Sequence, residues 1–267
     1  MKTLFPFPFG LIVLILIISC EKQTSWELDK SEKFPVVECI LTNELKYQEI
    51  RLYFSVNSLN EDPVGIRDAI IEITDGNMSV TFLSDPLEPG HYISAIPFRA
   101  LAGHIYRLTI ASEGIADTAW AEMTGVSPLD VIDIAPFDTL FHIIYHDSPQ
   151  ASMTEIHYDW SVSPSYCEKY GSCLAAEVFY TLDNIDAAKE FAPERLIIPF
   201  PIGTEIIRRR YSLSDAHQQF IRAVLLETDW RGGLFDAEQG NVPTNFHHGI
   251  HGWFALSSVV SDTIRYE

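Results

Sequence analysis

Basic residues are scarce in this chain. Only 18 of its 267 residues are Lys or Arg, against 37 Asp or Glu, and the formal net charge is −19 at pH 7. Binding to nucleic acid requires Lys and Arg side chains that neutralise phosphates, and adhesion to anionic lipid requires the same side chains. We therefore expect no nucleic-acid partner, and we expect any membrane attachment to have another cause.

A hydrophobic run long enough to span a bilayer as a helix is also missing. The most apolar stretch, residues 9–18, has about ten residues, whereas a spanning helix needs roughly twenty. It follows Lys2 and precedes Ser19, a pattern typical of a secretory signal. The next residue is Cys20, and segment 17–20 resembles the lipobox of bacterial lipoproteins, in which the cysteine is acylated and becomes the first residue. We predict a signal peptide over residues 1–19 and lipidation of Cys20, which would anchor the chain permanently. An ordinary signal peptide with a chance cysteine is the alternative.

Cysteine is rare, with four in the chain. Cys167 and Cys173 are six residues apart around Gly171, a spacing that favours a disulfide over a hairpin tip in an oxidising exported compartment. Free thiols are the alternative, and a metal site would need further ligands nearby. Cys39 lies in an apolar segment and is interpreted as a small buried residue.

Recognisable catalytic motifs are absent. The sequence has no Gly-x-Ser-x-Gly elbow and no phosphate-binding glycine loop before a helix. His247 and His251 are four apart, but Gly249 and Gly252 disfavour the helix on which a His-Glu-x-x-His zinc site is built. We interpret these histidines as polar contacts of a loop, with metal binding as the alternative. We expect no catalytic residue, no metal and no cofactor.

Three other groups of residues are weak signals. Glu177, Asp183 and Asp186 could bind calcium, although they lack regular ligand spacing and a solvated face is favoured. The basic run 208–210 is interpreted as the outward face of a strand that pairs with acidic residues, with an anion or partner site as the alternative. Aromatic residues that could stack on a sugar, but that pack in a core by default, are Trp160, Trp230, Trp253 and Phe246.

The remaining pattern is that of a mainly β protein. Seven short strand-like runs occupy residues 34–125, with turn signals every 8–12 residues, and Asp75-Gly76-Asn77 marks a hairpin. This profile predicts an immunoglobulin-like β-sandwich. Residues 20–33 are polar and charged and are interpreted as a flexible tether.

Residues 126–267 are expected to form a second β-rich module that carries one α-helix. Segment 124–130 is interpreted as the linker. The helix is predicted at about 214–228, because Ser212 or Ser214 is a suitable N-cap and an apolar stripe follows at helical spacing.

The C-terminal part of this module holds the candidate functional loop. Histidines and aromatic residues are frequent where partners dock, and here they gather within a few positions. The candidate residues are Asn245, Phe246, His247, His248, His251 and Trp253. The alternative is that Phe246 and Trp253 are core residues and that the glycines only turn the chain.

Several short motifs, in order, resemble one family. They are Cys20-Glu21-Lys22, Pro35-Val36-Val37-Glu38, Leu41-Thr42-Asn43, the run 69–75, Gly90-His91-Tyr92, the run 241–245 and Gly249-x-x-Gly252-Trp253-Phe254. Together they resemble the outer-membrane lipoproteins of Bacteroidota described as domain of unknown function 4249. The resemblance implies an all-β surface lipoprotein that accompanies a TonB-dependent outer-membrane transporter, and it implies no catalytic residue.

These observations favour a non-enzymatic lipoprotein that binds a ligand or partner at the outer membrane, on the cell surface rather than the periplasmic face. A structural or adhesive envelope protein is the second hypothesis. A metal-assisted hydrolase acting through His247 and His251 is the third.

Overall fold

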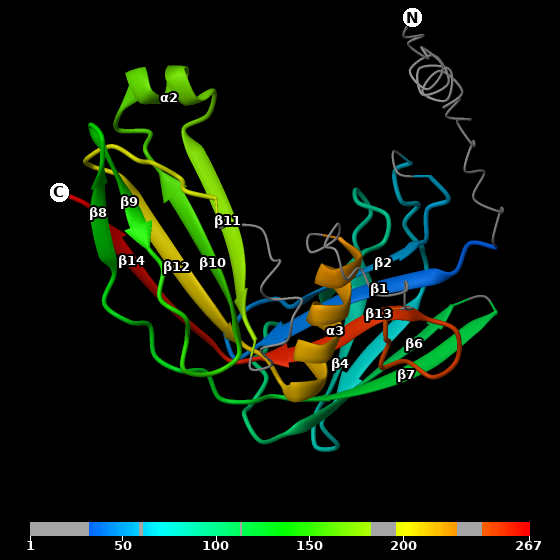
Figure 1. The fold of residues 1–267 in the computed structure, drawn as a ribbon. Helices are drawn as coiled ribbons and strands as arrows, with labels where there is room; N and C mark the ends of the chain where they lie inside the picture. Colours follow the sequence, from blue (N-terminus) through cyan, green and yellow to red (C-terminus); the bar gives the residue numbers. More distant parts are fainter. Residues whose placement is uncertain (1–31, 59–60, 113, 183–195, 229–241) are drawn as a thin grey trace, which may run out of the picture.

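The computed structural model describes residues 32–58, 61–112, 114–182, 196–228 and 242–267. The predicted signal peptide, Cys20 and most of the predicted tether lie outside the described residues. Within the described residues, no helix has the length and apolar character that crossing a membrane requires. The chain is mainly β, as predicted, and its strands form two large sheets and one hairpin (Figure 1).

The larger sheet has eight strands in the order β13-β1-β2-β5-β4-β3-β6-β7. Strand β13 pairs with β1 in parallel, and the other neighbours are antiparallel. The Asp75-Gly76 hairpin is confirmed, since Thr74 pairs with Ser79 across it. The bounds are β1 (Pro35–Thr42), β2 (Glu49–Phe54), β3 (Ile70–Thr74), β4 (Ser79–Ser84), β5 (His91–Ser94), β6 (Ile105–Ser112), β7 (Ile115–Glu122) and β13 (His251–Ser257).

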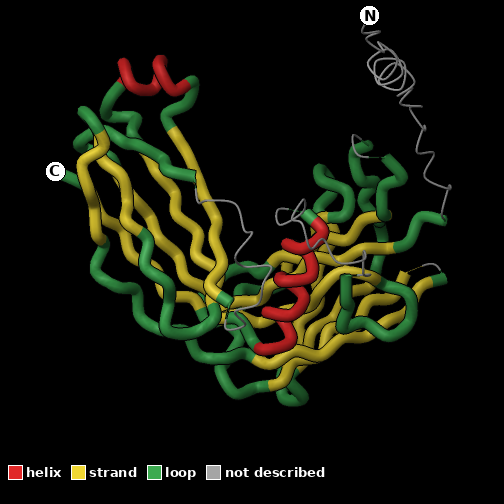
Figure 2. Tube along the Cα trace, viewed as in Figure 1, coloured by secondary structure: helices red, strands yellow, loops and turns green. Residues whose placement is uncertain are grey.

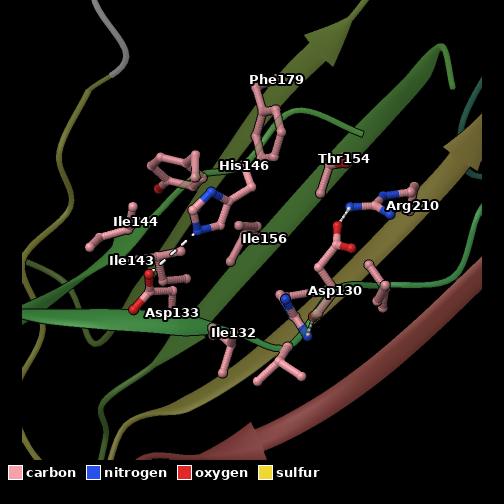
Figure 3. Close-up of a pocket in the computed structure, with 14 residues that line it drawn as sticks. Asp130, Ile132, Asp133, Ile143, Ile144, His146, Thr154, Ile156, Phe179 and Arg210 are labelled. Carbon is pink, nitrogen blue, oxygen red and sulfur yellow. Dashed lines mark hydrogen bonds and ion pairs between the residues drawn. The ribbon is translucent and has the colours of Figure 1, made fainter. Parts of the chain in front are cut away.

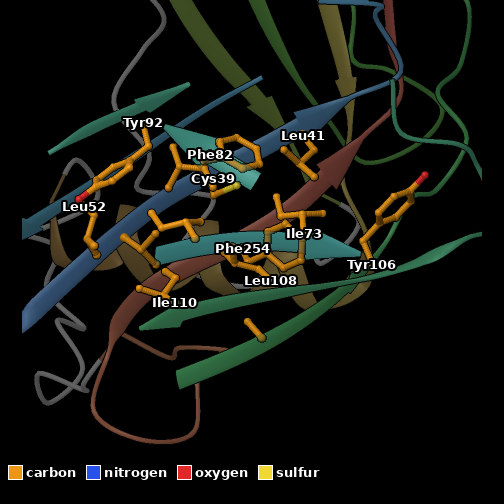
Figure 4. Packing of buried hydrophobic residues seen from close by; sticks show 14 of the residues in the cluster. Cys39, Leu41, Leu52, Ile73, Phe82, Tyr92, Tyr106, Leu108, Ile110 and Phe254 are labelled. Carbon is orange, nitrogen blue, oxygen red and sulfur yellow. The ribbon is translucent and has the colours of Figure 1, made fainter. Parts of the chain in front are cut away.

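This sheet curls around one hydrophobic core. Alternate residues of each strand point inward, so Val37, Cys39 and Leu41 of β1 are buried together with Phe254 of β13. Figure 4 shows these side chains converging with those of the facing strands. The two end strands, β7 and β13, come together, and a parallel bridge just beyond them joins Thr124 to Ser257.

The membership of β13 corrects the predicted division of the chain. Residues 126–267 were expected to form a separate module, yet β13 belongs to the sheet built by residues 34–125. Gly252 permits this close pairing. Its φ is +94°, and a Cβ at that position would lie 2.0 Å from the carbonyl oxygen of Val37. Because this oxygen is a backbone atom, rotation of a side chain could not remove the clash, and only glycine fits.

The second sheet has four antiparallel strands in the order β11-β10-β12-β14, and a two-stranded hairpin, β8–β9, accompanies it. The bounds are β8 (Asp133–Phe137), β9 (Leu140–Ile144), β10 (Ser152–Asp159), β11 (Leu174–Thr181), β12 (Glu205–Ser212) and β14 (Val259–Arg265). Its separate core includes Trp160 and Phe200, both 0% exposed. An isolated bridge from Phe141 to Phe200 attaches the hairpin to the segment before β12.

Two helices accompany the strands in the described residues (Figure 2). The predicted helix is confirmed as α3 (Asp215–Glu227), which Ser214 caps by accepting a hydrogen bond from the His217 N–H. It runs between the two sheets, along the outer surface of the larger one. The second helix, α2 (Pro164–Tyr170), lies at the far end of the β10–β11 pair and was not predicted.

A cluster of small hydroxyl side chains joins the two sheets. The C-terminal strand-like run crosses from one sheet to the other between Ser257 and Val259. Here the Ser258 and Ser212 hydroxyls both donate to the Thr124 carbonyl, at 2.7 and 2.9 Å, and the Ser257 hydroxyl donates to the Ser212 carbonyl at 2.9 Å. Because these side chains are small, the segments around Thr124, Ser212 and Ser258 can lie close together, and their buried carbonyl groups still receive hydrogen bonds.

Candidate binding groove

A buried carboxylate holds the predicted candidate loop in place. Asp117 on β7 is 2% exposed and accepts hydrogen bonds from the backbone N–H groups of Thr118, His247, His248 and Ile250, at 2.7, 2.9, 2.7 and 3.1 Å. Burial opposes ionisation of Asp117, but these four donors outweigh it and keep the pKa of the carboxyl below its ordinary value. The loop is therefore ordered through its backbone, and the side chains of His247 and His248 are left exposed.

Two of the predicted loop residues have structural roles. Phe246 is 5% exposed and packs in the core of the larger sheet. The Asn245 side chain exchanges two hydrogen bonds with the backbone of Phe254, at 2.7 and 3.0 Å, and donates a third to the Trp120 carbonyl at 3.3 Å. Asn245 thus bridges β13 and β7.

The other predicted residues separate into two places. His247 and His248 are exposed, and the ring of His247 lies 5.6 Å from that of Trp120. His251 and Trp253, on alternate positions of β13, instead line a groove on the outer face of the larger sheet. The structure does not bring all three histidines together.

This groove, which we call the α3 groove, runs between α3 and the paired strands β1 and β13 and has a volume of about 660 Å³. Its lining is mostly apolar. The walls are Phe220, Ile221 and Val224 on α3, Val36 and Ile40 on β1, and Trp253 on β13. A volume of this size and an apolar lining are typical of ligand-binding sites.

Strand β1 supplies walls that the sequence analysis did not identify as part of a site. Val36 and Ile40 alternate with the core residues Val37, Cys39 and Leu41, so the outer face of β1 carries two apolar side chains, one on each side of Glu38. A strand with a solvated outer face alternates between apolar and polar residues. The apolar residues Val36 and Ile40 on the outer side of β1 were a partial signal for the groove, since Glu38 lies between them on the same face.

Aromatic stacking shapes one wall of the α3 groove. The ring of Trp253 lies 4.9 Å from that of Phe220 and 6.4 Å from that of His217, with interplanar angles of 21° and 11°. His217 is 2% exposed, and its Nδ1 has no hydrogen-bond partner in the described residues. Burial lowers the pKa of His217 to about 4, so the imidazole is neutral at pH 7 and keeps the wall uncharged.

A hydrogen-bonded polar pair interrupts the apolar lining. The Tyr53 hydroxyl donates a hydrogen bond of 2.6 Å to Glu38 Oε1, and both residues line the groove. Burial, and then the neighbouring Glu38 carboxylate, raise the pKa of Tyr53, so the phenol keeps its proton. The pair offers a ligand acceptor oxygens rather than a cation.

The basic run was interpreted as an outward face, and the structure corrects this for two of its three residues. Alternation on β12 turns Arg208 and Arg210 inward, where they are 8% and 4% exposed. Arg208 pairs through two nitrogens with Asp262, and Arg210 Nη2 lies 3.1 Å from Asp130 Oδ2. Only Arg209 faces the other side, where it pairs with Glu44 at 2.6 Å.

Figure 3 shows Arg210 directed at Asp130, beside a small space under the linker. This space has a volume of about 30 Å³, which is comparable with one water molecule. Arg210 also donates to the Pro128 carbonyl, and Arg208 donates to the Asp130 carbonyl at 3.0 Å. The two arginines therefore fix the linker to the second sheet, and no organic ligand fits beside them.

The structure joins Cys167 and Cys173 in a disulfide with a Cα separation of 4.5 Å, although the setting differs from the expected hairpin tip. Cys167 lies within α2, so the bond ties this short helix to the start of β11 rather than linking two strands. Cys39 is buried and unpaired, as expected for a small core residue, and burial raises the pKa of its thiol.

The described residues of the possible calcium and sugar sites lie at separate places in the fold. Within the described part of the chain, no group of three or more His, Cys, Asp or Glu side chains is arranged to hold a metal ion. Glu177 accepts hydrogen bonds from the hydroxyls of Tyr145 and Tyr158, and Trp160 is a core residue. The other members of these sets, Asp183, Asp186 and Trp230, lie outside the described residues.

Comparisons with known proteins complete the description. The model of the family described as domain of unknown function (DUF4249) matches residues 21–263. Among solved structures, the FN1–FN3 domains of chicken CNTN1 are similar, at 11% sequence identity and a TM-score of 0.26. That match covers 68% of this chain and 61% of the other, so the chain spans less than two thirds of it. The comparison with curated proteins gave no match. Because the family model matches most of its length, the chain belongs to the DUF4249 family.

Proposed function

We propose that this protein is a non-enzymatic lipoprotein, anchored through Cys20, which binds a partner at the outer membrane through the α3 groove. The observation that carries the proposal is the groove itself, a mostly apolar space of about 660 Å³ whose aromatic wall includes the predicted residue Trp253. A mostly apolar cavity of this volume lies within the range of sites that bind ligands.

The position of the groove relative to the anchor supports a partner at the membrane. Phe34 lines the groove and follows Cys20 by fourteen residues in the sequence. Fourteen extended residues reach at most about 50 Å. Acylation of Cys20 therefore keeps the groove within about 50 Å of the bilayer, where the accessible partners are other envelope components.

The chemistry of the groove favours an apolar protein segment as its occupant. The walls are aliphatic and aromatic and include Trp253, and tryptophan is one of the residues enriched in the hot spots of protein interfaces. His217 is neutral, and the Glu38–Tyr53 pair can accept backbone N–H groups of an extended segment. We propose that the segment belongs to a TonB-dependent outer-membrane transporter, the partner implied by the family resemblance.

Co-purification of the acylated protein from detergent-solubilised outer membrane tests this proposal. Val224→Asp places a charge in the apolar wall, and Gln219→Asp places the same charge on the exposed side of the same helix. We expect a TonB-dependent transporter to co-purify with the wild type and with Gln219→Asp. We expect the amount that co-purifies with Val224→Asp to be at least ten-fold lower. Circular dichroism verifies that both variants are folded.

Two further results bear on the same proposal. Cys20→Ala should leave the protein unprocessed or absent from the membrane fraction, and normal outer-membrane abundance of that variant would show another anchor. Equal recovery of the transporter with Val224→Asp and Gln219→Asp would remove the groove as the binding site. Metal-dependent hydrolytic activity that His247→Ala abolishes would favour the hydrolase hypothesis instead.

A further inference from the structure

A second recess lies next to the α3 groove, where the two end strands of the larger sheet meet. We call it the Trp120 cleft; it has a volume of about 400 Å³. Trp253 lines both the groove and this cleft. The residues that matter for its chemistry are Trp120 and Glu122 on β7, Trp253 and Ala255 on β13, and Asp215 and Ala216 at the start of α3.

The curled sheet builds this cleft from three elements. Trp120 and Glu122 are two apart on β7 and share its outer face, as Trp253 and Ala255 do on β13. Asn245 hydrogen-bonds the backbone of both strands and so fixes the spacing between the two tryptophans. The small side chain of Ala255 leaves room on the floor, and Trp120 remains 50% exposed.

The charged side chains that line the cleft are all acidic. No Lys, Arg or His belongs to its lining, whereas two carboxylates, Glu122 and Asp215, do. Neither carboxylate forms a hydrogen bond or ion pair within the described residues. The N-terminus of α3 contributes a partial positive charge, which the full charge of Asp215 in the first turn offsets.

The guanidinium of Arg107 and the imidazole of His247 lie near the cleft but outside it. Arg107 is the cross-strand neighbour of Trp120, and His247 contacts the Trp120 ring at 5.6 Å. Neither one lines the recess. The lining therefore combines two indole rings and two carboxylates with no Lys, Arg or His side chain.

From this arrangement we infer that the Trp120 cleft binds an organic cation, an ammonium group carried by a small molecule or a lipid headgroup. The negative faces of tryptophan attract a cation within about 6 Å of the ring, and desolvation strengthens the attraction. The carboxylates add Coulombic attraction. They disfavour an anionic ligand for the same reason, and the volume lies within the range of small-molecule sites.

A neutral saccharide also stacks on tryptophan. The test therefore compares a cationic ligand with neutral ligands, so that binding due to charge is distinguished from binding due to shape alone. Isothermal titration of the mature acylated protein in detergent uses choline chloride and its neutral isostere 3,3-dimethyl-1-butanol, with methyl glucoside as the saccharide. We expect choline to bind at least ten-fold more tightly than either neutral compound. We also expect Trp120→Ala, Glu122→Gln and Asp215→Asn each to weaken choline binding at least five-fold.

Matched controls keep the result specific to this cleft. Tyr47→Ala removes another half-exposed aromatic ring and should leave binding unchanged, and Trp120→Phe should restore most of it. Choline bound free in solution supports a soluble ligand. Binding only to phosphatidylcholine vesicles, with the same loss in Trp120→Ala, supports a lipid headgroup of the same chemistry.

Three results would overturn the inference. They are equal affinity for choline and its neutral isostere, binding of methyl glucoside in preference to choline, and no binding of choline in either form at 10 mM, roughly the weakest affinity of interest. Because the readout is independent of any transporter, failure here leaves the proposed function of the α3 groove unaffected.

Discussion

The carboxylate of Asp117 accepts a hydrogen bond of 2.7 Å from the backbone N–H of His248, although the two residues are 131 positions apart. This contact fastens the C-terminal loop to a strand of the N-terminal half. The backbone of the loop, and not the imidazole rings, makes the hydrogen bonds to Asp117. The side chains of His247 and His248 can therefore be exposed while the loop backbone is held in place.

Asp117→Ala tests this fastening. The substitution leaves four backbone N–H groups without their acceptor, and we expect a loss of about 3–5 kcal/mol in the free energy of unfolding. Glu122→Ala, at an exposed position of the same strand, should change it by less than about 0.5 kcal/mol. Urea denaturation followed by fluorescence measures both. An Asp117→Ala variant as stable as the Glu122→Ala control would show that the contact is unimportant.

His217 predicts a pH dependence of stability. Its pKa is about 4 in the folded protein and 6.5 ordinarily, so between these values the unfolded chain binds more protons. The contribution of the neutral His217 to the free energy of unfolding is complete above about pH 7. It decreases as the pH falls from 6.5 towards 4, by about 3 kcal/mol in all. His217→Phe should flatten this part of the curve. Denaturation midpoints at a series of pH values measure the slope, and identical slopes for wild type and variant would contradict the assignment.

Neighbouring arginines provide a matched pair for the second sheet. Arg210→Leu leaves the Pro128 carbonyl and the half-exposed Asp130 without their buried donor, and we expect a cost of about 2–3 kcal/mol. Arg209→Leu breaks the partly exposed pair with Glu44 and a contact with the Tyr211 ring, and it should cost about 1 kcal/mol. Thermal unfolding of the two variants compares them directly. Similar melting temperatures would show that the linker is not held by Arg210.

The run 208–210 shows that burial of a charged side chain cannot be predicted from its neighbours in the sequence. A strand places successive side chains on opposite faces, so the sequence predicts that Arg209 differs from its neighbours, but the covering element could not be predicted. The linker returns over that face from residues about 80 positions earlier. Burial of a charge depends on such long-range contacts, which local composition does not contain.

The loop residues show a similar division. The sequence predicts the strands, the hairpin and α3, because alternation, turn residues and an N-cap are local. It does not predict that β13 leaves the second module to pair with β1, which depends on the absence of a side chain at Gly252. That pairing separates His251 and Trp253 from His247 and His248, and it creates the α3 groove.

Cysteine accessibility follows from the packing. The disulfide between Cys167 and Cys173 closes a short loop, and Cys39 is fully buried with a raised thiol pKa. In the native, non-reduced protein we expect iodoacetamide to modify none of the three, and in denaturant to modify Cys39 alone. Cys173→Ser should cost about 2–3 kcal/mol at most. Mass spectrometry that finds Cys167 and Cys173 alkylated without reduction would contradict the disulfide.

Photocrosslinking inside the α3 groove tests the central claim most directly. A photoreactive amino acid at Val224, within the groove, is compared in intact cells with the same group at Gln219, on the outer side of α3. We expect a crosslink from position 224 to a TonB-dependent outer-membrane transporter and none from position 219. No crosslink from position 224, or the same crosslink from both positions, would contradict binding in the groove.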